Sequence, residues 1–412
     1  TVSSGKDVTL VDADAIVLGT ASVSGDLDVS SSGNITNAGP LAITGTTTLA
    51  AGATNDIALN NPGNHFGGAL TVSSGKDVTL VDTGAIDFGT SAISGNLDVN
   101  AGGAITQSGP LDVDGTATFT TGNAAITLTD AANDFTGNVV LNNSNNNDVA
   151  IKDANDLSIG NSTVGTGTLT IDAANVTLAG GITSGNTVTF NNTGTLTGSG
   201  VVAAGTLVNF NGSDDAGSSG THLNTATPAI SVNTSGGADV YVTNQLNGGV
   251  TLTGNTTAGS TAIAVVSRNT GNSANAGVTI GGGNLVNSGA GSSVSLTGST
   301  LVLTGGITSP TIVLNFAGDL TGSGTLAAAV ALQLQGGGNV GTSGSLINID
   351  TPSLVLGNEA VLVHLHVIAF AQLLKDRRVG RRPADAEFFE LLHERSFRIA
   401  RRRLGEVLIR LH

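Results

Sequence analysis

The stretch TVSSGKDVTLVD occupies residues 1–12 of the 412-residue chain, and the same twelve residues return at 71–82. The similarity extends further, because residues 1–52 align without gaps on residues 71–122, with 31 of the 52 positions identical. An enzyme needs one copy of its catalytic residues. A stacked structure needs many copies, because each layer must fit the layer beneath it. The duplication therefore favours a repetitive, stacked fold.

Apolar positions keep their character between the two copies. Leu18 corresponds to Phe88 and Leu49 to Phe119, while the residues between them drift among Ser, Thr, Asn, Asp and Ala. Val17 is an exception, because the second copy has an aspartate at that position. We expect the retained apolar positions to form the core and position 17 to face water.

Two repeat lengths divide residues 1–357. Repeats of about 70 residues fill residues 1–200, and a repeat of about 124 residues fills residues 180–357. The third 70-residue copy matches the first two less closely, and the two copies of the longer repeat differ in length by one residue. The segments that show this are DVAIKDANDLSIG (148–160) against 77–89, GGITSGNTVTFNNTGTLTGSG (180–200) against 305–324, and GSSGTHLNTATPAI (217–230) against 341–354.

Short period-two runs such as DVTLVD, AITLT and TVTF recur between Gly, Asn, Asp and Ser, which is typical of strands joined by tight turns. With 60 Gly, one Tyr and no Trp, Met or Cys, the core has little aromatic bulk. These features predict an all-β, right-handed parallel β-helix with about 20 to 23 residues per rung, a rung being one full circuit of the coil. A row of β-sandwiches is the alternative, although such cores usually contain Trp or several Tyr.

Charge is distributed unevenly along the sequence. Residues 1–358 contain 23 Asp, no Glu and four Lys or Arg, a net charge of −19, whereas the rest of the chain has a net charge of +4. Nucleic-acid phosphates require Lys and Arg, so we predict that the chain does not bind nucleic acid. The absence of Glu also disfavours helices, because Asp is a residue of turns and caps.

The segment 358–412 breaks the repeat pattern. It is basic and rich in Glu and Arg, and residues 384–411 have apolar residues at helical spacing. Three interpretations are open: a helical cap on the coil, a basic amphipathic helix for a membrane surface or nucleic acid, or a stretch read out of frame. The apolar run 360–374 is too short for a membrane span, so we predict none.

One cluster suggests catalysis. Asp214 and Asp215 adjoin each other in NGSDDAGSSGTH, and His222 follows closely. Paired carboxylates act as general acid and base on glycosidic bonds, so these residues would serve a β-helical polysaccharide hydrolase or lyase. The corresponding copy, GGGNVGTSGSL at 336–346, has neither Asp nor His, and Asp is common in turns. We therefore predict no enzyme activity, with this hydrolase or lyase as the alternative.

We expect no cofactor and no dedicated metal site. The GGxGxDx calcium repeat of β-helices is absent, so only weak, non-specific calcium binding is expected from the acidic surface. His65 and His222 lack a second ligand at the spacing that zinc requires.

Three phrases resemble the repeats of filamentous-haemagglutinin-like adhesins of Gram-negative bacteria, which use two-partner secretion or autotransporter export. They are LTGSG…GTSG…NIDTPSL, GGAITQSGPLDVDGTATFT (102–120) and AANDFTGNVVLNN (131–143). The resemblance covers residues 1–357. It implies an extracellular, cell-surface fibre on the outer-membrane exterior, exported by an outer-membrane translocator. The implied partners are a receptor or glycan on a host or neighbouring cell, and the implied role is attachment or projection of a binding tip.

Overall fold

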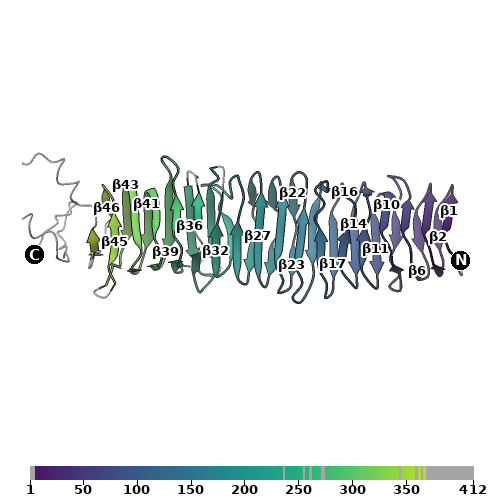
Figure 1. The fold of residues 1–412 in the computed structure, drawn as a ribbon, viewed down its shortest axis with the longest axis horizontal. Helices are drawn as coiled ribbons and strands as arrows, with labels where there is room; N and C mark the ends of the chain where they lie inside the picture. Colours follow the sequence, from purple (N-terminus) through teal and green to yellow (C-terminus); the bar gives the residue numbers. More distant parts are fainter. Residues whose placement is uncertain are drawn as a thin grey trace, which may run out of the picture. The chain divides into compact units, whose positions relative to one another are not determined.

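The computed structural model describes residues 5–234, 237–253, 256–258, 262–270, 274–342, 345–357, 361–362 and 365–367. The named secondary-structure elements of these residues are all β-strands, and these strands pair with one another in parallel. The predicted all-β parallel β-helix is therefore confirmed. The chain forms two compact units, Thr1–Gly212 and Ser213–His412, within each of which strands stack side by side (Figure 1).

In the first unit, each rung places a strand in register with its counterpart about 20 residues later. Val8 pairs with Leu27, Leu27 with Thr47 and Thr47 with Leu70. The spacing of 19 to 23 residues agrees with the rung length expected from the sequence. The strands of this first column include β1 (Val8–Asp12), β4 (Leu27–Ser31), β7 (Thr47–Ala50) and β10 (Leu70–Ser74).

A second column alternates with the first along the chain and forms a separate sheet. Its strands include β2 (Ile16–Leu18), β5 (Ile35–Asn37), β8 (Ile57–Leu59), β11 (Val78–Asp82), β14 (Leu97–Ala101), β17 (Ala117–Thr121) and β20 (Asn138–Asn142). Alternate side chains of these strands are buried, so each sheet turns one face inward and one to solvent. Short strands at the corners form two further three-stranded sheets.

The two copies of the opening sequence lie on different sheets. β1 and β11 both read VTLVD, yet β1 belongs to the first column and β11 to the second. Three rungs separate Val8 from Leu70 in the first column. Val78 follows half a rung after Leu70 and lies in the second column, in register after Ile16, Ile35 and Ile57. The 70-residue repeat therefore spans three and a half rungs. Because the half rung moves each copy to the other sheet, copied residues do not stack directly on one another.

Burial of a strand depends on the rungs beside it. β11 is paired on both edges, with β8 and β14, and three of its five side chains are buried. β1 has the same sequence but pairs with β4 alone among the described residues, and none of its side chains is buried. Val11 is 80% exposed, whereas its copy Val81 is half-buried. The identical sequence thus shows that burial comes from stacking between rungs.

The retained apolar positions form the core, as expected. Leu18, Leu49 and their counterparts Phe88 and Phe119 are all buried, and Val17 is 66% exposed. In the second copy, Phe88, Phe119 and Phe135 come from three different sheets and make two successive edge-to-face contacts in the core, with ring centroids 6.4 and 6.2 Å apart. Phe therefore supplies the bulk that the leucines provide in the first copy.

Buried asparagine side chains form hydrogen bonds with backbone groups at the turns of the coil. Asn64 and Asn133 are both fully buried. The Asn64 Oδ1 accepts the Leu41 N–H at 3.0 Å, and the Asn133 Oδ1 accepts the Leu111 N–H at 2.9 Å. Each amide group also donates to a backbone carbonyl, so a corner that cannot complete the sheet ladder still has its polar groups paired.

The second unit contains the longest strands, β41 (Ile307–Phe316) and β43 (Thr325–Gly336), which pair along most of their length. Its other strands include β31 (Leu223–Ala226), β33 (Val240–Gln245), β36 (Ala262–Arg268), β39 (Ser293–Gly298), β44 (Asn339–Val340), β45 (Ile347–Asp350), β47 (Val361–Leu362) and β48 (Leu365–Val367).

Two short strands lie within the segment 358–412. β47 pairs with β44, and β48 pairs with β45. The predicted helix at 384–411 lies outside the described residues. Among the residues that the structure describes, no helix is long and apolar enough to span a membrane.

The 124-residue repeat keeps its backbone turns. Gly198 has φ +117° and its counterpart Gly322 has φ +108°. Both values lie in the region that favours glycine. A Cβ on Gly198 would stand 2.4 Å from the backbone oxygen of Leu178 on the neighbouring rung. Glycine is therefore required here by both conformation and space.

We predict that Phe119→Ala lowers the free energy of unfolding by about 3–5 kcal/mol, because it leaves a cavity between two ring contacts. Phe119→Leu, which copies Leu49, should cost less than about 1.5 kcal/mol. Urea unfolding followed by circular dichroism measures both changes. Equal losses in the two variants would contradict the packing account.

We also predict that Gly198→Ala destabilises the protein by about 1–3 kcal/mol. Gly122→Ala is the matched control, because a Cβ there would meet nothing within 4 Å, and it should change stability by less than about 0.5 kcal/mol. Thermal melting of the two variants compares them. A Gly198→Ala variant as stable as Gly122→Ala would refute the requirement for glycine.

Candidate functional site

The three residues predicted for the enzyme alternative lie at the start of the second unit. Asp214 is exposed, and its carboxylate accepts the Asp215 N–H at 2.8 Å. The Asp215 carboxylate accepts the N–H of Asp239, on the next rung, at 2.8 Å. His222 directly precedes β31. Both carboxylates therefore bond to backbone N–H groups, as Asp commonly does in turns.

Tyr241 joins these residues from β33. Its neighbours Val240 and Val242 are buried, so the tyrosine side chain lies on the outer face of the strand. The His222 and Tyr241 rings are tilted by 46°, with centroids 5.8 Å apart. The His222 Nδ1 lies 3.2 Å from the Thr243 hydroxyl oxygen, which orients the imidazole.

Carboxylates surround the tyrosine hydroxyl. The Tyr241 hydroxyl donates to the Asp239 carboxylate at 3.5 Å, and the other oxygen of Asp239 accepts the Ala262 N–H at 2.8 Å. Burial raises the pKa of Tyr241, and the charges of Asp239 and Asp215 raise it further. The surface near the ring therefore has a negative electrostatic potential.

We call Asp214, Asp215, His222, Asp239 and Tyr241 the Tyr241 cluster. Sequence reasoning found Asp214, Asp215 and His222 but missed Asp239 and Tyr241, which lie one rung further along. The available signal was that Tyr241 is the one tyrosine of the chain, at an outward position of a period-two run. Carboxylates, a ring face and an imidazole form a surface suited to binding. No group of three or more potential metal-ligating His, Cys, Asp or Glu side chains occurs in the described part of the chain.

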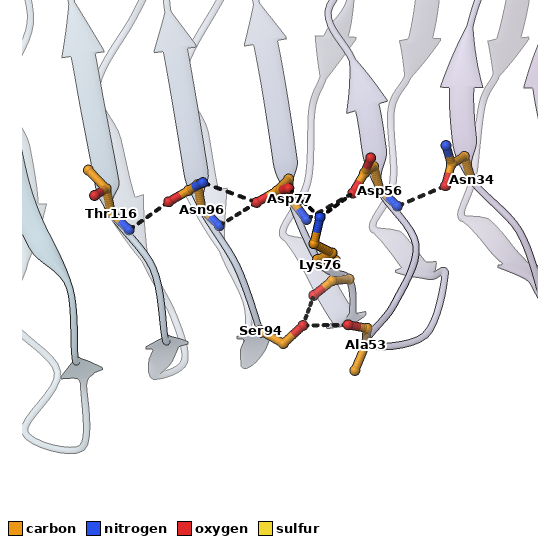
Figure 2. Close-up of polar contacts among 9 residues, drawn as sticks. Asn34, Ala53, Asp56, Lys76, Asp77, Ser94, Asn96 and Thr116 are labelled. Atoms are coloured by element: carbon orange, nitrogen blue, oxygen red, sulfur yellow. Dashed lines mark hydrogen bonds and ion pairs between the residues drawn. The ribbon is translucent and has the colours of Figure 1, made fainter.

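A second polar feature runs along the first unit at the turn that precedes β8, β11 and β14. Side-chain oxygens at this turn accept a backbone N–H from the next rung (Figure 2). The successive acceptor–donor pairs are Asn34–Asp56, Asp56–Asp77, Asp77–Asn96 and Asn96–Thr116, with donor–acceptor distances of 3.0, 3.3, 2.9 and 2.9 Å. We call this series the Asx ladder. It pairs N–H groups that the strand ladder does not reach.

Lys76 is the single cation beside the Asx ladder in Figure 2. Its Nζ lies 2.9 Å from the Asp77 carboxylate and 3.9 Å from that of Asp56. The Asn96 backbone N–H, followed by the Lys76 ammonium, lowers the pKa of Asp77 below its usual value. Because Asp and Asn both offer an acceptor oxygen, the ladder reads as a structural feature that tolerates either residue.

The lowered pKa of Asp77 predicts a dependence of stability on pH. Its stabilising contribution is present above the usual Asp pKa and is lost as the pH falls through the lower pKa of the folded state. Asp77→Asn keeps the acceptor oxygen but does not titrate, so it should lose less stability on acidification. Urea midpoints at about pH 6 and about pH 2.5 test this. Asp98→Asn, an exposed position of β14, is the control, and equal losses in wild type and Asp77→Asn would contradict the prediction.

Two consecutive segments, residues 5–73 and 75–142, match a family described as repeats of unknown function (DUF5649). No curated protein and no solved structure matches the chain. The matched segments correspond to the first two 70-residue repeats, each spanning about three and a half rungs. The chain is thus similar to a known repeat unit, and it is a repeat protein with a β-solenoid fold.

Proposed function

We propose that this chain is a structural and adhesive section of a large secreted surface fibre, of the filamentous-haemagglutinin-like kind. The observation that supports this most is the 70-residue repeat whose identical segments fit either sheet of the coil. A coil of this construction gains length by duplication without redesign of its core. Length at a cell surface serves attachment or the projection of a binding tip.

The surface chemistry suits an exposed and exported chain. Outward positions carry mainly Asp, Asn, Thr and Ser, and the net charge of −19 over residues 1–358 favours solubility. The chain has no cysteine, so no disulfide would obstruct passage of an unfolded chain through an outer-membrane translocator. The proposed location is the exterior of a Gram-negative outer membrane, and the proposed partner is a receptor or glycan on a host or neighbouring cell.

A β-helical polysaccharide hydrolase or lyase is the second candidate. The observation that favours it is that Asp215 contacts Asp239, while Tyr241 contacts both Asp239 and His222; Asp214 adjoins this group as the chain neighbour of Asp215. The fibre is preferred, because the Asp214 and Asp215 carboxylates each accept a backbone N–H.

Adhesion is tested with fluorescent beads that carry the purified chain, applied to cultured epithelial cells and to Gram-negative bacteria. The proposal predicts saturable attachment to at least one cell type, competed by the free chain. Albumin-coated beads give the background. Attachment that equals this background on every cell type would contradict the adhesive role.

Catalysis is tested by sugar release from polygalacturonate and other acidic polysaccharides. The fibre proposal predicts no release above that of buffer. Asp214→Asn and Asp215→Asn are the matched variants, because asparagine keeps a side-chain oxygen that accepts the same N–H group. Release by the wild type that both variants lose would establish the hydrolase or lyase instead.

A further inference from the structure

Tyr241 is exceptional among the aromatic side chains of the described residues. All seven phenylalanines there are buried, from Phe66 to Phe316, whereas Tyr241 is partly exposed on the outer face of β33. Tyr is enriched at contact surfaces, because its ring combines an apolar face with a polar tip.

Among the described residues, the register partner on one side of the Tyr241 ring is small. In register, Tyr241 lies between His222 and Ala264, because Val242 pairs with Leu223 and Tyr241 pairs with Ala264. Adjacent strands are about 4.8 Å apart. The imidazole forms a wall on one side, and the alanine methyl group on the other is too small to cover the ring. The described residue in register on that side therefore covers little of the ring.

The charge around the Tyr241 ring is negative. The Asp215 carboxylate accepts the Asp239 N–H and the Asp239 carboxylate accepts the Ala262 N–H, and both carboxylates raise the pKa of the tyrosine hydroxyl. Arg268 is the one Lys or Arg between residues 213 and 357. It lies in register with Gln245, four residues along the strand from the position of Tyr241, or about 13 Å away. An anionic ligand would meet no counter-charge at the ring.

The turn between Ser218 and Thr221 does not need the Asp214 and His222 side chains. Ser218 and Thr221 exchange N–H···O bonds of 2.9 and 3.1 Å across a tight turn, and Thr342 and Ser345 repeat the same bonds in the next copy. The second turn forms although the positions corresponding to Asp214 and His222 are Gly338 and Leu346. Asp214 and His222 therefore add side-chain chemistry to a turn that forms without them.

We propose that the Tyr241 cluster binds an organic ammonium group, with the Tyr241 ring as the platform and the Asp215 and Asp239 carboxylates as counter-charges. The quadrupole of the tyrosine ring attracts a cation over its face, and the partly exposed carboxylates add a screened attraction. The expected dissociation constant for a single group is about millimolar. Several such contacts along a fibre would add by avidity.

This inference gives the proposed adhesive function a receptor chemistry, yet its test does not use cells. Failure of the titration below leaves the bead experiment unaffected, and failure of the bead experiment leaves the titration unaffected. The two proposals are therefore separable.

The test is a titration of the full chain with choline, followed by the ring signals of Tyr241. Because the chain has one Tyr and no Trp, these signals and the tyrosine fluorescence report on this site alone. The matched neutral probe is 3,3-dimethylbutanol, which has the same shape without the charge. The proposal predicts a saturable shift with choline and binding of the neutral probe at least about ten-fold weaker, or about 1.4 kcal/mol.

Variants separate the ring from its hydroxyl and from the carboxylates. Tyr241→Phe keeps the ring face and should bind choline within about three-fold of wild type. Tyr241→Leu should abolish binding, measured by calorimetry with circular dichroism as the check on folding. Asp215→Asn keeps the bond to the Asp239 N–H and should weaken binding about three- to ten-fold.

Two probes distinguish the sources of the ammonium group. Tighter binding of choline than of lysine amide would indicate a quaternary ammonium headgroup, and the reverse would indicate lysine side chains of a protein partner. Both outcomes support the proposal. Equal shifts with choline and the neutral probe, or no saturable shift at about 100 mM choline, would overturn it.

Discussion

The register of parallel strands is the constraint on which the rest of the structure depends. Backbone hydrogen bonds hold each residue beside a single partner on the next rung, about 4.8 Å away, so side chains meet in columns along the coil. Apolar columns exclude water, and polar columns must supply their own acceptors. The stacked rings of Phe190 and Phe210, which are register partners with centroids 6.0 Å apart, and the Asx ladder both follow from this constraint. Neither would form if one strand slipped by a residue, because every side chain would change face.

The half-rung offset explains how a long repeat remains compatible with two sheets. Successive copies of VTLVD alternate between the sheets, so both sheets must accept the same strand sequence and the same turns. This requirement favours short β-branched side chains and tight Gly, Asn and Asp turns. It also favours polar columns in which Asp and Asn are interchangeable. The amino-acid composition is therefore a consequence of the repeat geometry.

Much of the fold could be predicted from sequence. The period-two alternation indicates burial directly, and so does the correspondence of Leu18 in the first copy to Phe88 in the second. The half-rung offset could not, because it depends on the lengths of individual turns. The burial of Asn64 could not be predicted either, since asparagine is far more common at the surface. At the candidate site, Asp214 and Asp215 were visible as neighbours in sequence. Tyr241 joined them only through the register that places it beside His222.

The most direct test of the account is to insert a second copy of residues 13–82 directly after residue 82 and to measure amide hydrogen exchange along the chain. The insert adds a complete 70-residue repeat, three and a half rungs, and restores the same sequence at its junction. The account predicts that the inserted strands gain protection equal to that of β11 and β14 and that no separate unfolding transition appears. An insert that exchanges rapidly, or that melts as an independent domain, would contradict the claim that register-matched stacking builds this protein.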